Sequence, residues 1–150
     1  MDKLAYVYFT PLYKVIRQYI DGYNVKKIKY NLTVPVLLRV AFQKNLVNLH
    51  SHMWIPPHVF PFLSKPLNPK LHFVHQRNYC VFVRSFGGRI HSYDVELKKQ
   101  VDILKSDLDK AGLAYPQDFF WFAGYDAPWT VHGRHNEVWL RVVKKKKFNY

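Results

Sequence analysis

The segment Phe119–Val142 constrains the fold more than any other part of this chain. Its first residues alternate between two apolar faces, which is typical of a strand covered on both sides. Gly124–Pro128 then interrupts the strand, because proline cannot donate to a β-ladder and glycine tolerates the dihedral angles of a sharp exit. A second turn follows at Gly133–Asn136, and Glu137–Val142 alternates again. This pattern predicts two antiparallel strands joined by a long loop.

The same segment carries motifs that are typical of a known family. GYDAPW at Gly124–Trp129 and GRHNEVWL at Gly133–Leu140 resemble the GYDPP-like turn and the GRRNEVWL motif of the SOUL heme-binding protein family. Three more segments resemble its helix exit, its M-T-x-P-V strand and its F-x-R-x-F-G-G strand end, in the family's order: YIDGYN at Tyr19–Asn24, LTVPV at Leu32–Val36 and FVRSFGG at Phe82–Gly88. The resemblance therefore extends over most of the chain.

The length of 150 residues fits a single domain over residues 1–150 that can bury a core without metal or disulfides, with a basic tail at residues 143–150. Cys80 is the only cysteine, so an internal disulfide is excluded, and its place in an alternating run predicts a buried thiol. No apolar run reaches the ~18 residues of a spanning helix, and the N-terminus does not resemble a secretory signal. We therefore expect a cytoplasmic protein.

The charge of the chain is strongly positive and unevenly distributed. Its 23 basic and 10 acidic residues give a net charge of +13, and no Asp or Glu occurs between Asp21 and Asp94. Such a surface attracts anions. Heme propionates, anionic lipid headgroups, nucleic-acid phosphates and an acidic protein all fit, and charge alone does not select among them.

Two helices are predicted. Thr10 and Pro11 mark the start of the first, and Gly22 marks its end. Its apolar stripe consists of Leu12, Val15, Ile16, Tyr19 and Ile20. The second helix is expected from about Ser92 to Gly112. Its stripe consists of Leu97, Val101, Leu104 and Leu108.

The remaining segments predict strands. Lys26–Val40 is predicted as a β segment broken around Thr33 and Pro35, and Leu46–Ile55 as a second strand. Leu71–His75 and Tyr79–Phe86 are expected to form a hairpin, which Gly87 and Gly88 end.

Because long parallel crossovers are not needed, the predicted class is α+β. The resemblance implies a distorted antiparallel β-barrel or twisted sheet with two packed helices, built from two βαββ-like halves. The chain begins almost at its first helix, so the first strand is expected to be missing if the sequence is complete. An open sheet edge would then favour a homodimer or a protein partner.

The resemblance also implies that heme binds to a shallow apolar surface near the first helix, with basic residues beside it. On this helix Tyr13, Ile16 and Ile20 could contact the macrocycle, and Lys14 and Arg17 could hold the propionates. The alternative is that both isoleucines belong to the core and both cations face solvent.

Two histidines are candidates for metal or heme-iron ligation. His50 and His52 are two residues apart on a predicted strand, so they share one face. The alternative is ordinary polar alternation. His135 occupies the position at which the family motif has arginine, so an anion contact there could be weaker or pH dependent.

No enzyme signature occurs: the chain contains no GxSxG elbow, no phosphate-binding glycine loop and no HExxH. Nucleic-acid binding is not expected, because the aromatic residues follow strand and helix periodicity, although the basic clusters fit a weak contact with an anionic surface. The predicted function is therefore a non-enzymatic carrier or buffer of heme or another tetrapyrrole. The alternative is a protein-interaction module of the same fold that has lost its ligand.

Overall fold

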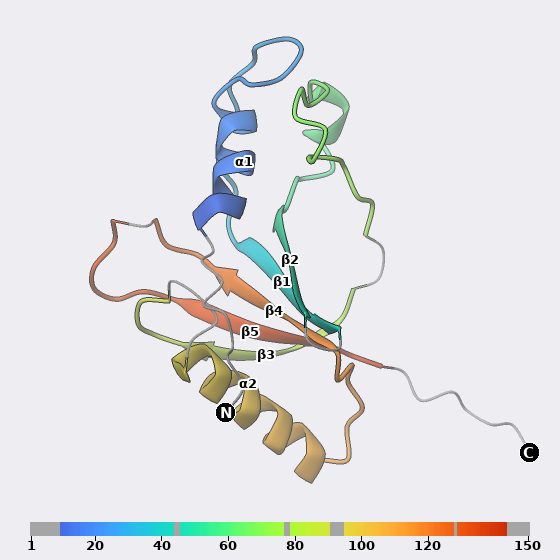
Figure 1. The fold of residues 1–150 in the computed structure, drawn as a ribbon, viewed down its shortest axis with the longest axis vertical. Coiled ribbons are helices and arrows are strands. Elements are labelled where there is room, and N and C mark those ends of the chain that lie inside the picture. The colour runs from blue at the N-terminus through green and yellow to red at the C-terminus, as the bar shows by residue number, and fades with distance from the viewer. Residues whose placement is uncertain (1–9, 44–45, 77–78, 91–94, 128, 144–150) are drawn as a thin grey trace, which may run out of the picture.

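The structure is a computed structural model that describes residues 10–43, 46–76, 79–90, 95–127 and 129–143. In chain order its elements are α1 (Thr10–Ile20), β1 (Val36–Gln43), β2 (Leu46–Met53), the short 3-10 helix η1 (Phe60–Phe62), β3 (Val81–Phe86), α2 (Val95–Lys110), β4 (Phe119–Gly124) and β5 (Asn136–Arg141) (Figure 1). The predicted α+β class with two main helices is confirmed.

The five strands form one antiparallel sheet in the order β2-β1-β4-β5-β3. The sheet is open, because β2 and β3 lie at its two edges and no described strand pairs with their outer sides. Of the two forms that the resemblance implies, the described residues therefore adopt the twisted sheet and not a closed barrel.

The sheet is built from two similar halves. β1 and β4 are neighbours at its centre, β2 flanks β1, and β5 flanks β4. In the second half, β3-α2-β4-β5 has the predicted βαββ order. The first half is α1-β1-β2, and any strand ahead of α1 would fall outside the described residues.

The closing hairpin has the predicted form. β4 and β5 pair antiparallel, with Trp121 opposite Trp139. The guanidinium of Arg134 donates to the carbonyl oxygens of Ala127 and Thr130 at 3.0 and 2.9 Å. The long loop is thus held by its own arginine, which the family-like motif contributes.

Two strand predictions were wrong, one of them only in part. Of the predicted segment Lys26–Val40, the residues from Val36 onwards form the start of β1. The residues before Val36 form a loop, in which Lys27 has a φ of 54° and the Tyr30 amide donates to the Ile20 carbonyl at 2.8 Å. Leu71–His75 forms no strand, and β3 pairs with β5 instead. The physical reason is burial: against β5, Phe82 lies opposite the fully buried Leu140, whereas Leu71–His75 is mostly exposed.

Both helices cover the same face of the sheet. The predicted α2 stripe is buried in one cluster with side chains of β1, β4 and β5: Leu38, Val40, Leu97, Val101, Leu104, Leu108, Phe120, Phe122, Val138 and Leu140. Leu12 of α1 packs against the same cluster, together with Phe42, Val47 and Leu49. The other face therefore has no described helix over it, and we call it the helix-free face.

The ends of the chain elements also differ in part from expectation. Gly22 closes α1 as predicted, with a φ of 109° and a hydrogen bond from the Tyr23 amide to the Gln18 carbonyl at 2.9 Å. Cys80 is exposed, so the prediction of a buried thiol was wrong. It precedes β3, and its position outside the sheet leaves it uncovered.

No helix of the described residues is long and apolar enough to cross a membrane.

Replacing Leu97 by alanine tests the packing of α2 on the sheet. Its side chain is fully buried, and such a truncation costs about 2–5 kcal/mol because it leaves a cavity. Urea denaturation of the wild type and of the variant measures this loss in the free energy of unfolding. The matched control is Val95→Ala on the same helix, where the side chain is exposed and the change is expected to stay within about 0.5 kcal/mol.

Candidate functional site

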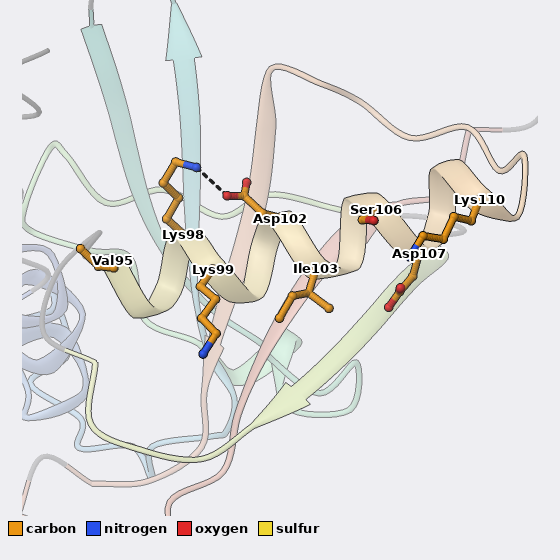
Figure 2. Close-up of a pocket in the computed structure, with 8 residues that line it drawn as sticks. All are labelled: Val95, Lys98, Lys99, Asp102, Ile103, Ser106, Asp107 and Lys110. Atoms are coloured by element: carbon orange, nitrogen blue, oxygen red, sulfur yellow. Dashed lines mark hydrogen bonds and ion pairs between the residues drawn. The ribbon is translucent and has the colours of Figure 1, made fainter. Parts of the chain in front are cut away.

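Two surfaces of the molecule could serve as a site, and the first is a shallow hollow along the outer side of α2. Its volume is about 530 Å³, and all of its lining residues come from this one helix (Figure 2). Both lysines and aspartates line it, and Lys98 pairs with Asp102 across one turn. Mixed charges on a single helix face are typical of a solvated surface, so this hollow is not the candidate site.

The second surface is the helix-free face. Strand alternation places there the residues that lie between the core positions of β1, β2, β4 and β5. By register, Arg39 of β1 lies between His50 of β2 and Trp121 of β4, and Trp121 in turn lies opposite Trp139 of β5. This face therefore combines indole rings with cations, whereas the helix-covered face is aliphatic and phenylalanine-rich.

Trp121 is at the centre of this face. The ring of His52 meets it edge-on, with 4.8 Å between ring centroids. The indole Nε1 of Trp121 donates to the hydroxyl of Tyr79, whose ring is 6.2 Å from Trp121 and perpendicular to it. Burial raises the pKa of Tyr79, so the phenol stays protonated. Trp121, Tyr79 and His52 thus form a compact aromatic cluster that is only partly covered.

His52 has an unusual environment. Its Nε2 is buried and has no hydrogen-bond partner among the described residues. Burial lowers the pKa of His52 to about 4, and the positive charges of His50, Arg39 and His72 lower it further. At neutral pH the imidazole is therefore uncharged, and within the described ranges its buried Nε2 is left without a hydrogen-bond partner.

Two arginines flank the aromatic cluster. The guanidinium of Arg39 lies 4.3 Å from the centroid of the Phe119 ring, and that of Arg141 lies 5.5 Å from the centroid of Tyr79. Neither arginine has a carboxylate partner in the described part of the chain. Both remain available to an anion bound over this face.

Glu137 organises the part of this face beside the β4–β5 loop. Its carboxylate accepts hydrogen bonds from Trp139 Nε1 at 2.7 Å and from the Tyr125 hydroxyl at 2.8 Å, and it contacts His135 Nε2 at 2.9 Å. Burial raises the pKa of Glu137, but these three partners together outweigh it and leave the pKa below its ordinary value. Burial and this carboxylate also raise the pKa of Tyr125 to about 12. His135 therefore belongs to an internal carboxylate network.

The residues predicted on α1 are divided between core and surface. Ile16 and Ile20 are buried, with 7% and 2% of their area exposed. Lys14 and Arg17 are exposed, and Arg17 Nε donates to Asp21 Oδ2 at 2.8 Å. Tyr13 is partly exposed. Ring contacts by the two isoleucines would require them to leave the interior, and the predicted site on α1 stays a prediction.

His50 and His52 share one face, with their ring centroids 6.5 Å apart. Within the described ranges, no group of three or more His, Cys, Asp or Glu side chains could hold a metal ion. Ligation by this pair alone stays a prediction.

Four residues of the helix-free face were not predicted from the sequence: Arg39, Tyr79, Trp121 and Arg141. They come from four separate segments, and contacts between segments cannot be read from the sequence. The only sequence signal is that Arg39, Trp121 and Arg141 occupy alternate strand positions, on the face opposite the core residues.

Comparison with known proteins identifies the family. A sequence model of the SOUL heme-binding protein family matches residues 9–141, most of the chain. The chain belongs to the SOUL heme-binding protein family. The motifs around Arg134 and Glu137 that resemble this family thus form the loop support and the carboxylate network described above.

Three similar proteins are mammalian heme-binding proteins. Heme-binding protein 2 of Mus musculus is 31% identical over 127 residues, which are 81% of this chain and 60% of the relative. Heme-binding protein 2 of Homo sapiens is 29% identical over 130 residues, covering 83% of this chain and 62% of the relative. Heme-binding protein 1 of Mus musculus is 27% identical over 133 residues, covering 83% and 66%. The chain thus spans about three fifths of the length of the first of these relatives.

The environment of His52 makes stability depend on pH. Because its pKa is near 4 in the folded protein and its ordinary value is 6.5, the unfolded chain binds the proton more readily between these values. The contribution of the neutral His52 ring to the free energy of unfolding is therefore fully present above pH 6.5 and is lost as the pH falls towards 4. Urea midpoints at pH 7 and pH 5 should therefore differ less in His52→Gln than in the wild type. His58→Gln, which removes an exposed loop histidine, should keep the wild-type difference.

Proposed function

We propose that this SOUL family member is a non-enzymatic protein that binds heme or a related tetrapyrrole reversibly, as a carrier or buffer in the cytoplasm. Family membership and the names of the similar proteins, heme-binding proteins 1 and 2, support the ligand class. The single observation that carries the proposal is the buried, unpartnered Nε2 of His52 beside Trp121, on a face flanked by two arginines.

The residues of the helix-free face fit such a group. A tetrapyrrole requires flat apolar area for its ring, and Trp121, Trp139 and Tyr79 supply aromatic area. Its two carboxylates require cations, and Arg39 and Arg141 have no competing acidic partner in the described ranges. Heme would supply an iron centre that accepts a nitrogen ligand, and the neutral imidazole of His52 would be the residue to hold it.

A shallow site of this kind is consistent with reversible binding. The aromatic cluster is partly exposed, so much of a bound ring would stay in contact with water. The expected affinity is therefore about micromolar, well below that of a ligand enclosed in a deep pocket.

The groups on this face support the non-enzymatic part of the proposal. Its carboxylate, Glu137, is occupied by Trp139, Tyr125 and His135 and is held ionised, so it is a poor general acid. Nothing in the sequence resembles a nucleophile motif beside a base.

A hemin titration followed by the Soret band tests the proposal. The wild type should give a saturable one-to-one change, and His52→Ala should lower the affinity roughly 10-fold and shift the band, because the imidazole nitrogen is lost. His58→Ala is the matched control and should behave as the wild type. A featureless drift with the wild type would refute tetrapyrrole binding, and a wild-type spectrum for His52→Ala would refute the role of His52.

The site predicted on α1 is tested separately in the same titration. If Lys14 and Arg17 hold the propionates, changing both to glutamate should lower the affinity about 10-fold or more, because attraction becomes repulsion. The corresponding change of Arg39 and Arg141 tests the helix-free face. Reduced affinity in only one of the two double variants assigns the propionate contacts to that surface.

The second candidate function is a protein-interaction module that has kept the fold without the ligand. The open outer edges of β2 and β3 favour it, since unpaired backbone groups on an edge strand can pair with a second copy or with another protein. Sedimentation of the ligand-free protein over a concentration series would reveal a homodimer. If the protein is a monomer and does not bind hemin, the partner expected at the sheet edge is a different protein.

A further inference from the structure

Two loops beyond the C-terminal end of α1, residues 21–30 and 60–70, are joined into one unit that we call the apical loops (Figure 1). The amide of Val25 donates to the carbonyl of Lys65 at 3.0 Å. Asn24 and Pro66 form an isolated antiparallel bridge. Segments separated by more than thirty positions therefore share one surface.

Buried polar side chains fix this unit. Asn24 is completely buried, and its Nδ2 donates to the Ile28 carbonyl at 2.7 Å. Ser64 is also buried, and its Oγ accepts a hydrogen bond from the Lys26 amide at 2.9 Å. The hydroxyl of Tyr19 on α1 donates to the Ser64 carbonyl at 2.8 Å. Because these buried groups are satisfied, the apical loops have a defined shape.

Large apolar side chains of the apical loops nevertheless remain in water. Phe62 is the most exposed, at 72% of its area. The set comprises Tyr23, Val25, Ile28, Phe60, Phe62 and Leu67. They lie outside the core cluster of the sheet, so the packing of the helices on the sheet does not explain their exposure. A concentration of exposed apolar residues on an ordered surface indicates an interaction site.

The same loops are densely cationic. Their lysines, all exposed, are Lys26, Lys27, Lys29, Lys65 and Lys70. None of them has a carboxylate partner in the described part of the structure. Asp21, at the start of these loops, pairs with Arg17 of α1 at 2.8 Å, and no acidic residue occurs in the sequence between Asp21 and Asp94.

We propose that the apical loops are a docking surface for an anionic lipid bilayer. In this arrangement Phe62, Val25 and their apolar neighbours enter the boundary between headgroups and acyl chains, and the lysines contact anionic headgroups. A nucleic acid fits less well, because it would use the cations and stack on aromatic rings but would leave Val25 and Leu67 without a role. The surface is separate from the helix-free face and does not depend on tetrapyrrole binding.

Cosedimentation of the full chain with phosphatidylcholine vesicles, with and without phosphatidylserine, tests this proposal. We expect binding only to the vesicles with phosphatidylserine. Lys26→Ala with Lys65→Ala should weaken binding about 30-fold, since each lysine at such a surface contributes a comparable share. Val25→Ser with Phe62→Ser should weaken it at least roughly 10-fold, since the inserted apolar area is lost.

Matched controls lie on the outer face of α2, where Val95, Lys99 and Lys110 are also exposed. Lys99→Ala with Lys110→Ala, and separately Val95→Ser, should bind as the wild type does. Equal losses of vesicle binding in the control and apical variants would overturn the proposal. Unchanged vesicle binding by the apical variants would also overturn it, and would assign the binding to the basic tail. The proposal would also be overturned if the protein did not bind vesicles but was retained on RNA. If the double variant Lys26→Ala with Lys65→Ala then lost this retention, the surface would be assigned to nucleic acid.

Discussion

Burial of one face of the sheet beneath both helices is the constraint on which the rest of the molecule depends. The α2 stripe meets β1, β4 and β5 across a closed apolar layer, and α1 extends this layer through Leu12. Apolar burial of this size drives folding. Because both helices pack on one face of the sheet, strand alternation places the remaining residues of each strand on the other face. The residues of the helix-free face are therefore not needed for this core and can contact a ligand.

The helix-free face keeps polar groups partly out of water in two different ways. Glu137 is satisfied by three neighbours and stays ionised, which fixes the rings of Trp139 and Tyr125 around it. His52 is left without a partner, and its surroundings keep it neutral. A satisfied network supports structure, whereas an unsatisfied buried nitrogen has a free-energy cost that a ligand can recover. This contrast is why His52 and not Glu137 is placed at the centre of the proposed site.

The apical loops have the opposite arrangement, with satisfied polar groups inside and apolar side chains outside. Asn24 and Ser64 use their hydrogen bonds to close the loops, so Phe62 and Val25 are not needed for closure. The two proposed surfaces share no residue. A carrier of an amphiphilic tetrapyrrole that also docks on a bilayer would bring its cargo next to the phase in which such a ring partitions.

The sequence by itself determined the α+β class, both amphipathic helices and the closing hairpin, because each depends on local periodicity and on turn residues such as Gly22 and Pro128. It also determined the family, through motifs that include Arg134 and Glu137. Only the tertiary structure decided that β3 pairs with β5, since strand partners are chosen by burial between distant segments. Only the tertiary structure brought Arg39, His52, Tyr79 and Trp121 together, because contacts across strands leave no regular spacing in the chain.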